Sequence, residues 1–206
     1  MLWRDSLVMY DRATRSLWSQ VNGQAVAGPL KGQSLHEVPS EQTTWGKWKR
    51  RYPDTLVLVK PPLRGSPYAS YFDDPDRIGV RGSKNPDGRL GGKELVVGIE
   101  AKGRFAAVPL DLVEKRGAVN LEAIGVPLVV TRMASFDRRV GNQTLTFAAV
   151  APASLRDRET GSRWLVETGE AVDGPLKGKR LQRVSAKVVY WAIWARFHPR
   201  SELIRR

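Results

Sequence analysis

Two Asp-Arg pairs, Asp11-Arg12 and Asp157-Arg158, each precede a tryptophan by the same short interval. A carboxylate, a guanidinium and an indole together can bind a charged ligand, because arginine pairs with anions and also stacks on aromatic rings. The candidate ligand-binding residues are therefore Asp11, Arg12, Trp18, Asp157, Arg158 and Trp164. In the alternative, structural interpretation, each Asp hydrogen-bonds the backbone of its own turn and each Arg stacks on the Trp. The recurrence favours this alternative, since a single active site does not need a second copy.

No other group of side chains matches a known catalytic pattern. The chain has no cysteine, which excludes thiolate nucleophiles, cysteine-bound zinc and iron–sulfur clusters. Its two histidines, His36 and His198, are not accompanied by a Gly-x-Ser-x-Gly nucleophile motif. Asp73, Asp74 and Asp76 lack the glycine and the glutamate of a calcium-binding EF-hand loop. We therefore assign no catalytic residue, no metal site and no cofactor, and the sequence favours a protein that is not an enzyme.

The candidate residues belong to a passage that the chain contains twice. Residues 11–58 align with residues 157–204 without a gap. Three landmarks recur in the same order: a Gly-Pro-Leu-Lys-Gly segment, a Trp-x-x-Trp segment and a later proline. They lie at 28–32 and 174–178, at 45–48 and 191–194, and at Pro53 and Pro199. The repeat predicts that two distant parts of the chain fold into the same small unit.

Each unit begins with a predicted hairpin. Leu7–Tyr10 is an apolar run typical of a strand, and Ser16–Ser19 is the expected return strand. The turn falls at residues 13–15 in the first copy and at 159–161 in the second. Gly161 suits the positive φ of such a turn, whereas Arg15 at the same place implies local strain or a different turn.

A tryptophan-bearing helix is predicted to follow in each copy. Spacings of three and four residues put the large aromatic side chains on one helix face, and we expect both faces to lie in the core. These residues are Trp45, Trp48 and Tyr52 in the first copy, and Trp191, Trp194 and His198 in the second. The expected N-caps are Ser40 and Ser185. Strands are predicted before each helix at 34–38 and 180–184, and after it at Thr55–Leu58 and Ser201–Ile204.

The remaining sequence sets the domain organisation. Residues 1–59 are a partial first repeat, residues 60–92 are a Pro/Gly-rich connection, and residues 93–206 are a complete second repeat. The second repeat opens with strands predicted at 95–99, 105–110 and 126–131, a short helix at 111–114, and a hairpin that turns at Gly141-Asn142. The expected fold class is α+β: β-rich, with mostly antiparallel strands and one Trp-bearing helix per repeat.

The net charge of +13 raises nucleic acid as a partner. The charge is scattered along the chain, and its densest group is Lys47, Lys49, Arg50 and Arg51. No apolar run reaches the roughly 18 residues of a membrane span, and the first residues are not a secretory signal. The visible N-terminus therefore predicts a cytoplasmic protein.

Several of these segments resemble a bacterial and archaeal family, domain of unknown function 3179. They are residues 7–20, the Gly-Pro-Leu-Lys-Gly at 28–32, Trp45 to Pro53, Pro67-Tyr68-x-x-Tyr71, and Val97-Gly98-Ile99. The resemblance implies two similar halves, each opening with a Val-Gly-Val-like strand and ending with the Trp helix. It also implies a Cys-Pro-Leu-Cys type of motif before the first unit, and this chain has none. The resemblance also implies export, if this chain is truncated relative to the family.

Three functional hypotheses follow. The first is a non-catalytic binding or scaffold module, with a second chain or a homo-oligomer covering the missing half repeat. The second is part of an enzyme or redox-linked protein whose Cys-bearing half lies outside this chain. The third is a basic module that binds nucleic acid.

Overall fold

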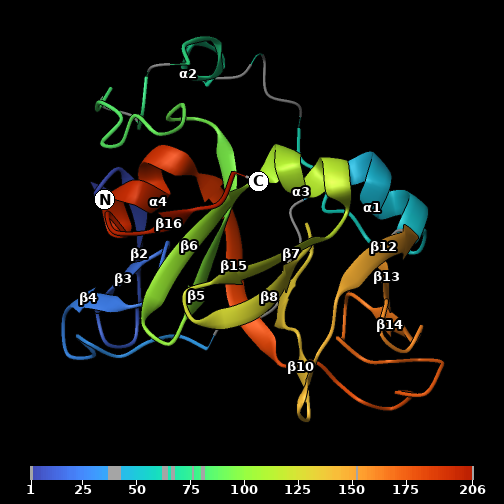
Figure 1. The fold of residues 1–206 in the computed structure, drawn as a ribbon. Helices are drawn as coiled ribbons and strands as arrows, with labels where there is room; N and C mark the ends of the chain where they lie inside the picture. The colour runs from blue at the N-terminus through green and yellow to red at the C-terminus, as the bar shows by residue number, and fades with distance from the viewer. Residues whose placement is uncertain are drawn as a thin grey trace.

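The computed structural model describes residues 2–36, 43–61, 65, 68–75, 77–79, 82–151 and 153–205. The fold is strand-rich α+β, and the strands among the described residues form four sheets (Figure 1). The largest sheet has seven strands in the order β16-β6-β5-β15-β9-β8-β7. Every pairing between described strands is antiparallel except that of β16 with β6. The predicted fold class, α+β with mostly antiparallel strands, is therefore confirmed.

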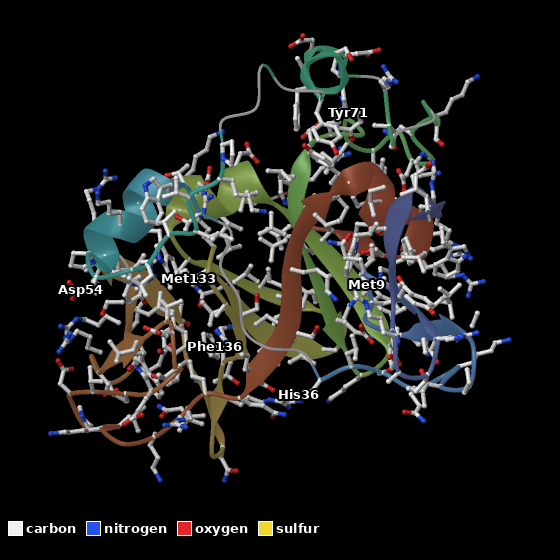
Figure 2. All side chains as sticks on the ribbon, turned by 180° about the vertical axis from the view of Figure 1, so that it is seen from behind. Met9, His36, Asp54, Tyr71, Met133 and Phe136 are labelled. Atoms are coloured by element: carbon white, nitrogen blue, oxygen red, sulfur yellow. The ribbon has the colours of Figure 1, made fainter. Side chains whose placement is uncertain are left out.

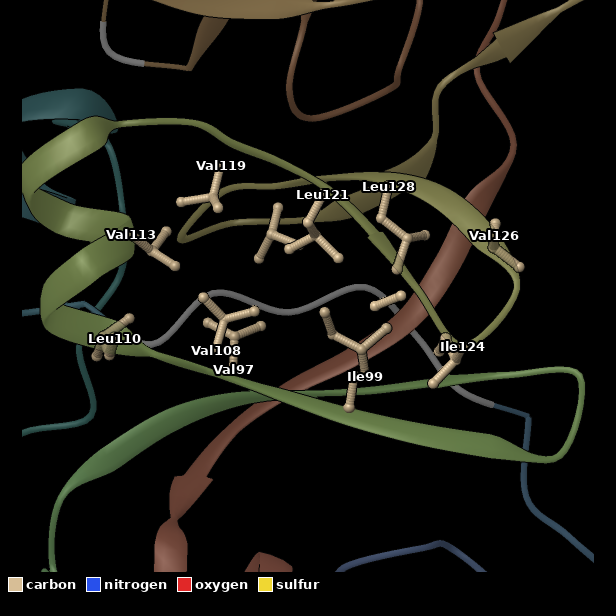
Figure 3. Close-up of a cluster of buried hydrophobic side chains, with 13 residues drawn as sticks. Val97, Ile99, Val108, Leu110, Val113, Val119, Leu121, Ile124, Val126 and Leu128 are labelled. Carbon is tan, nitrogen blue, oxygen red and sulfur yellow. The ribbon is translucent and has the colours of Figure 1, made fainter. Parts of the chain in front are cut away.

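The seven-stranded sheet folds over on itself. Its strands are β5 (Leu95–Ala101), β6 (Arg104–Pro109), β7 (Val119–Ala123), β8 (Val126–Val130), β9 (Ser135–Asp137), β15 (Arg183–Tyr190) and β16 (Glu202–Leu203). Figure 3 shows β5 and β6 facing β7 and β8 across a cluster of aliphatic side chains, with α3 (Leu110–Arg116) at one end. Val97 and Ile99 point into this cluster. Since side chains alternate along a strand, Val96 and Gly98 face the other side of the sheet.

Helix α4 (Trp191–Phe197) covers that other side. Trp191 and Trp194 are fully buried and pack with Val96 and Ala107. A Cβ atom at Gly98 would lie 2.4 Å from the indole ring of Trp194, so only glycine fits beneath this tryptophan. The prediction of a buried tryptophan stripe is confirmed for the second copy.

Two smaller sheets flank the large one on opposite sides (Figure 1). The first has strands β1 (Leu2–Trp3), β2 (Ser6–Tyr10), β3 (Leu17–Ser19) and β4 (Ala25–Ala27). The second has strands β12 (Phe147–Ala151), β13 (Ser154–Asp157) and β14 (Arg163–Leu165). The hairpin predicted at Gly141-Asn142 is confirmed by strands β10 (Arg139–Val140) and β11 (Gln143–Thr144). The two remaining helices are α1 (Trp45–Arg51) and α2 (Ala69–Asp73).

One of the predicted N-caps is wrong. Ser185 lies within β15, which continues to Tyr190 and is paired with β5 and β9. This pairing between two strands from distant parts of the sequence holds residues 185–190 extended, so α4 begins only at Trp191. The other predicted cap, Ser40, lies outside the described residues. Thr44 caps α1, because its hydroxyl accepts a hydrogen bond from the Lys47 backbone N–H at 3.4 Å.

The predicted core position of the first tryptophan stripe is also wrong. Helix α1 buries no residue, and Trp45 is 50% exposed. Thr55–Leu58 was expected to form a strand, but it forms none, and Leu56 is 96% exposed. The physical reason is a missing neighbour: α4 and β16 lie on β5 and β6, whereas no comparable hairpin covers α1 in the part of the chain that the structure describes.

The two tryptophans should therefore differ in their effect on stability. We expect Trp194→Ala to lower the free energy of unfolding by about 3–5 kcal/mol, because it leaves a cavity over Gly98. Trp48→Ala should cost about 1 kcal/mol or less, because α1 lies at the surface. Urea unfolding followed by circular dichroism measures both values, and equal losses would contradict the difference in burial.

Candidate functional site

The first Asp-Arg pair lies in the turn between β2 and β3. Asp11 Oδ1 accepts hydrogen bonds from the backbone N–H groups of Ala13 (2.8 Å) and Thr14 (3.3 Å). Asp11 Oδ2 accepts one from the Thr14 hydroxyl, and this bond holds the pKa of Asp11 below its usual value. Arg15 has a φ of +61°, in agreement with the strain expected at that position. The carboxylate thus organises its own turn.

The second pair is built in the same way around a more deeply buried carboxylate. Asp157 Oδ1 accepts from the backbone N–H of Thr160 (2.6 Å) and from its hydroxyl (2.8 Å). Asp157 Oδ2 accepts from Nε1 of Trp164 at 2.8 Å, and this tryptophan is completely buried. Gly161 takes the positive φ of +73° that was predicted for it. Asp157 therefore fixes both a turn and the orientation of a core indole.

A serine and a glycine join each turn to the Gly-Pro-Leu-Lys-Gly segment. The hydroxyl of Ser16 accepts from the Leu30 backbone N–H at 3.1 Å, and the hydroxyl of Ser162 accepts from that of Leu176 at 3.0 Å. A Cβ atom on Gly28 or on Gly174 would lie 2.7 Å from the Cα atom of the corresponding serine. The segment needs glycine there because the two backbones touch.

The structure does not bring the six candidate residues together. The turns containing Asp11 and Asp157 lie in the two flanking sheets, on opposite sides of the seven-stranded sheet (Figure 1). Both arginines, Arg12 and Arg158, are exposed, whereas Trp18 is buried like Trp164. The carboxylates are engaged by their own turns. Ligand binding by these residues stays a prediction.

The buried carboxylate gives a test of its structural role. Asp157→Ala leaves the Trp164 N–H without its acceptor in the core, and we expect it to lower the free energy of unfolding by about 2–3 kcal/mol. Asp11→Ala is the matched control, and its cost should be smaller because that turn lies nearer the surface. Thermal unfolding of both variants measures the difference. A stable Asp157→Ala protein would show that Trp164 is held by packing alone.

A second kind of site is the exposed segment that contains α1, which we define as residues 44–59 and call the open module. The backbone N–H of Tyr52 donates to the carbonyl of Trp48 at 2.8 Å and ends the helix. Nε1 of Trp48 then donates to the Thr55 hydroxyl at 2.9 Å. The rings of Trp48 and Tyr52 are 4.5 Å apart. These contacts fold the helix, the turn and the following segment into one piece.

The same piece occurs in the second copy as residues 190–204, which we call the covered module. There His198 ends the helix by the equivalent bond to Trp194 (2.8 Å), and Nε1 of Trp194 donates to the Ser201 hydroxyl at 2.8 Å. The residues that end the helices, Tyr52 and His198, have φ and ψ of −130° and 77°, and of −130° and 68°. The two modules share their internal geometry and differ in what lies against them.

The open module leaves its apolar end exposed. The four residues after Thr55 are 96%, 54%, 81% and 86% exposed, and they are Leu56, Val57, Leu58 and Val59. The equivalents of the first three in the covered module are Glu202, Leu203 and Ile204, which are only partly exposed. Sequence reasoning missed this surface because apolar runs usually predict buried strands. In the sequence these four residues carry no charge or turn signal that would mark them as exposed.

A cavity of about 610 Å³ lies between α1 and two other segments, the turn before β9 and the loop between β12 and β13. Lys47, Trp48 and Arg50 line it from the helix, and Met133 and Ala153 line it from the second copy. Figure 2 shows Met133 below α1. Arg51 spans the gap by an ion pair with Glu167 at 3.2 Å. The helix is therefore held at one end and is loosely packed elsewhere.

A second cavity, of about 370 Å³, lies at the end of α4. His198 forms part of its wall and stacks on Phe105 with ring centroids 3.9 Å apart. Burial, and then the positive charges of Lys187 and Arg4, lower the pKa of His198 to about 4. The imidazole is thus neutral near pH 7 and serves as an aromatic wall.

This histidine predicts a pH effect on stability. Between about pH 6.5 and pH 4 the unfolded chain protonates this histidine while the folded chain does not. Wild-type stability should therefore fall as pH falls through this window, and His198→Gln should remove that part of the fall. Thermal melts at several pH values measure it, with His36→Gln as a control at an exposed histidine. Parallel pH profiles for wild type and His198→Gln would contradict the burial effect.

The described residues hold no group of three or more His, Asp or Glu side chains arranged for a metal ion. Of the loop aspartates, Asp73 and Asp74 belong to this part of the chain and Asp76 lies outside it. None of the helices in the described ranges has the length and apolar character that a bilayer crossing requires.

Comparison with known proteins gives a family match. A family model described as "Protein of unknown function (DUF3179)" matches residues 1–201. This match confirms the resemblance seen in the sequence. No curated protein and no solved structure matches the chain significantly.

Proposed function

The chain belongs to the DUF3179 family of proteins of unknown function, and we propose that it is a non-catalytic binding or scaffold module. In this proposal residues 1–59 are a partial first repeat and residues 93–206 are a complete second repeat. Residues 60–92 are the Pro/Gly-rich connection between them. Each repeat contributes one Trp-bearing helix. The partial repeat supplies the binding surface.

One observation carries the proposal: the same structural piece is covered in one place and exposed in another. Trp48 and Thr55 make the bond that Trp194 and Ser201 make, so the open module is already folded. A preformed surface binds with little loss of conformational entropy. Its consecutive exposed aliphatic residues, Leu56–Val59, are unusual for a free surface and typical of an interaction site.

The polar chemistry of the repeat supports binding over catalysis. Asp157 and Trp164 are committed to each other, and the Ser16 and Ser162 hydroxyls are bonded to backbone N–H groups. These contacts are structural in kind. They support a unit in which the polar groups stabilise the fold and the exposed apolar groups bind a partner.

Nucleic acid is a second candidate partner, favoured by the exposed basic residues on α1. Lys47, Lys49 and Arg50 are exposed there, and the net charge is +13. The two candidates use different residues of the same module, because nucleic acid would contact the cations and a polypeptide would contact Leu56–Val59. Substitutions in the two groups therefore separate them.

We expect the wild-type chain, purified from its own host without nuclease treatment, to elute in a complex heavier than its own 23.0 kDa. Leu56→Asp with Leu58→Asp should release the monomer without changing the melting temperature, because both side chains are exposed. Size-exclusion chromatography with light scattering gives the masses.

Two matched variants complete this experiment. Tyr10→Asp with Leu35→Asp adds the same charge at exposed residues elsewhere and should keep the complex. Lys47→Glu with Lys49→Glu should also keep it. A complex that is lost only in this last variant would favour nucleic acid, and a wild-type monomer would refute the proposed function.

A further inference from the structure

We propose that the second cavity, the one at the end of α4, binds a small aromatic carboxylate, which is a flat ring system that carries one carboxylate group. The site goes beyond the proposed function, because the residues that line it belong to the second copy and none of them comes from Leu56–Val59. The cavity volume of about 370 Å³ lies within the range of small-molecule sites and suits a ligand of one or two rings.

Aromatic rings form one wall of this cavity. Phe105 of β6 and His198 at the end of α4 are stacked, with an angle of 21° between their planes. Phe197 also lines the cavity, and the buried Trp194 contacts His198 with ring centroids 4.3 Å apart. Because these rings hold one another in place, they offer a rigid surface against which an aromatic ring of the ligand can pack.

Two tight turns border the same cavity. Residues 102–103 join β5 to β6 and residues 124–125 join β7 to β8, at the end of the aliphatic cluster away from α3 (Figure 3). All four residues have a positive φ, which is typical of two-residue hairpin loops. Such loops favour Asn, Asp or Gly at their first position, but the β7–β8 turn has Ile124 there.

Ile124 is the unusual residue of the cavity wall. Its φ of +52° is a left-handed conformation that β-branched residues rarely adopt. The side chain is buried in the aliphatic cluster, so the surrounding fold holds the residue in this conformation. Strained residues that the fold maintains in this way are concentrated at active sites and ligand-binding sites. Ile124 thus adds a rigid apolar surface next to the aromatic wall.

Two arginines give the rim of the cavity a positive charge. Arg104 and Arg200 line it and are exposed, and Glu202 is the only acidic residue among the described residues that line it. The low pKa of His198 leaves its ring neutral near pH 7, so two positive charges and one negative charge give a net charge of +1. A carboxylate would neutralise this charge, whereas a phosphate monoester carries nearly two negative charges.

Arg104 is placed to bind a second carboxylate. Its Nη2 donates to Oε1 of Glu202 at 3.2 Å, and this ion pair is weak because both side chains are largely exposed. A Cβ atom on Gly125 would lie 3.5 Å from Nη1 of Arg104, so this end of the guanidinium lies over the β7–β8 turn. The guanidinium has five N–H donors, which leaves several for a ligand.

These features imply one orientation of the ligand. Its rings would pack against Phe105, His198 and Ile124, and its carboxylate would point outward to Arg104 and Arg200. Ring packing supplies affinity and the arginines select for the anion, since guanidinium groups match the planar geometry of a carboxylate.

The test follows the amide signals of the isotope-labelled full chain by nuclear magnetic resonance during titration with defined compounds. We expect naphthoate to shift the signals of residues 103–105 and 198–202 with a dissociation constant of about 1 mM or tighter. Naphthalenemethanol has the same rings without the charge and should bind about tenfold more weakly. Acetate, which has no ring, should not bind.

Substitutions at the rim should give effects of opposite sign. Arg104→Gln and Arg200→Gln each remove a charged donor and should weaken naphthoate binding about tenfold. Glu202→Gln removes the competing carboxylate beside Arg104 and should strengthen it about threefold. Arg158→Gln, which removes an exposed arginine from the turn between β13 and β14, should leave the affinity unchanged.

Several results would overturn the inference. They are no saturable shift with naphthoate, wild-type affinity in both arginine variants, weaker binding by Glu202→Gln, or shifts centred outside the cavity. Tighter binding of naphthyl phosphate than of naphthoate would overturn the assignment to a carboxylate. None of these results bears on the proposed function, which is tested by the mass of the complex and by substitutions at Leu56 and Leu58.

Discussion

The contact between an indole ring and a bare stretch of backbone is the constraint on which this fold depends. Trp194 lies over Gly98 at a distance that no side chain could share, and this brings α4 against the sheet. A buried tryptophan removes on the order of 200 Å² from water, which is worth about 5 kcal/mol. With Trp191 beside it, this contact joins the end of the chain to a hairpin nearly a hundred residues earlier. The β16 pairing and the stacking of His198 follow from it.

The open module shows that the conformation of this piece forms without a contact like that of Trp194 with Gly98. The open and covered modules share a helix end and a bond from tryptophan to a hydroxyl, although only one of them lies on a sheet. Local hydrogen bonds therefore fix the conformation, and the neighbouring hairpin fixes only the burial. This separation makes the open module suited to binding, because little reorganisation is needed when a partner arrives.

Sequence patterns predicted where strands and helices lie better than they predicted which strands pair and which helix faces are buried. Apolar runs located β5, β6 and β8, and the turn chemistry of Gly161 and Arg15 was read correctly. Ser185 was misread as a helix cap, because pairing with two distant strands is not visible in local sequence. Periodicity placed Trp45 and Trp48 on one face, but it could not reveal that nothing among the described residues covers that face. For the candidate site, the Asp turns were foreseeable and the exposure of Leu56–Val59 was not.

The order of strands in the large sheet has a consequence for synthesis on the ribosome. Strand β15 lies between β5 and β9 in space, yet it follows both by many residues in the sequence. The β5–β6 hairpin and the β7–β8–β9 meander thus emerge as two separate pieces, each with an unpaired edge facing the gap. They can join only after β15 has left the exit tunnel. Nascent chains of this protein therefore carry unpaired β edges from the emergence of β5 until β15 follows, and during that interval these edges can pair with other chains.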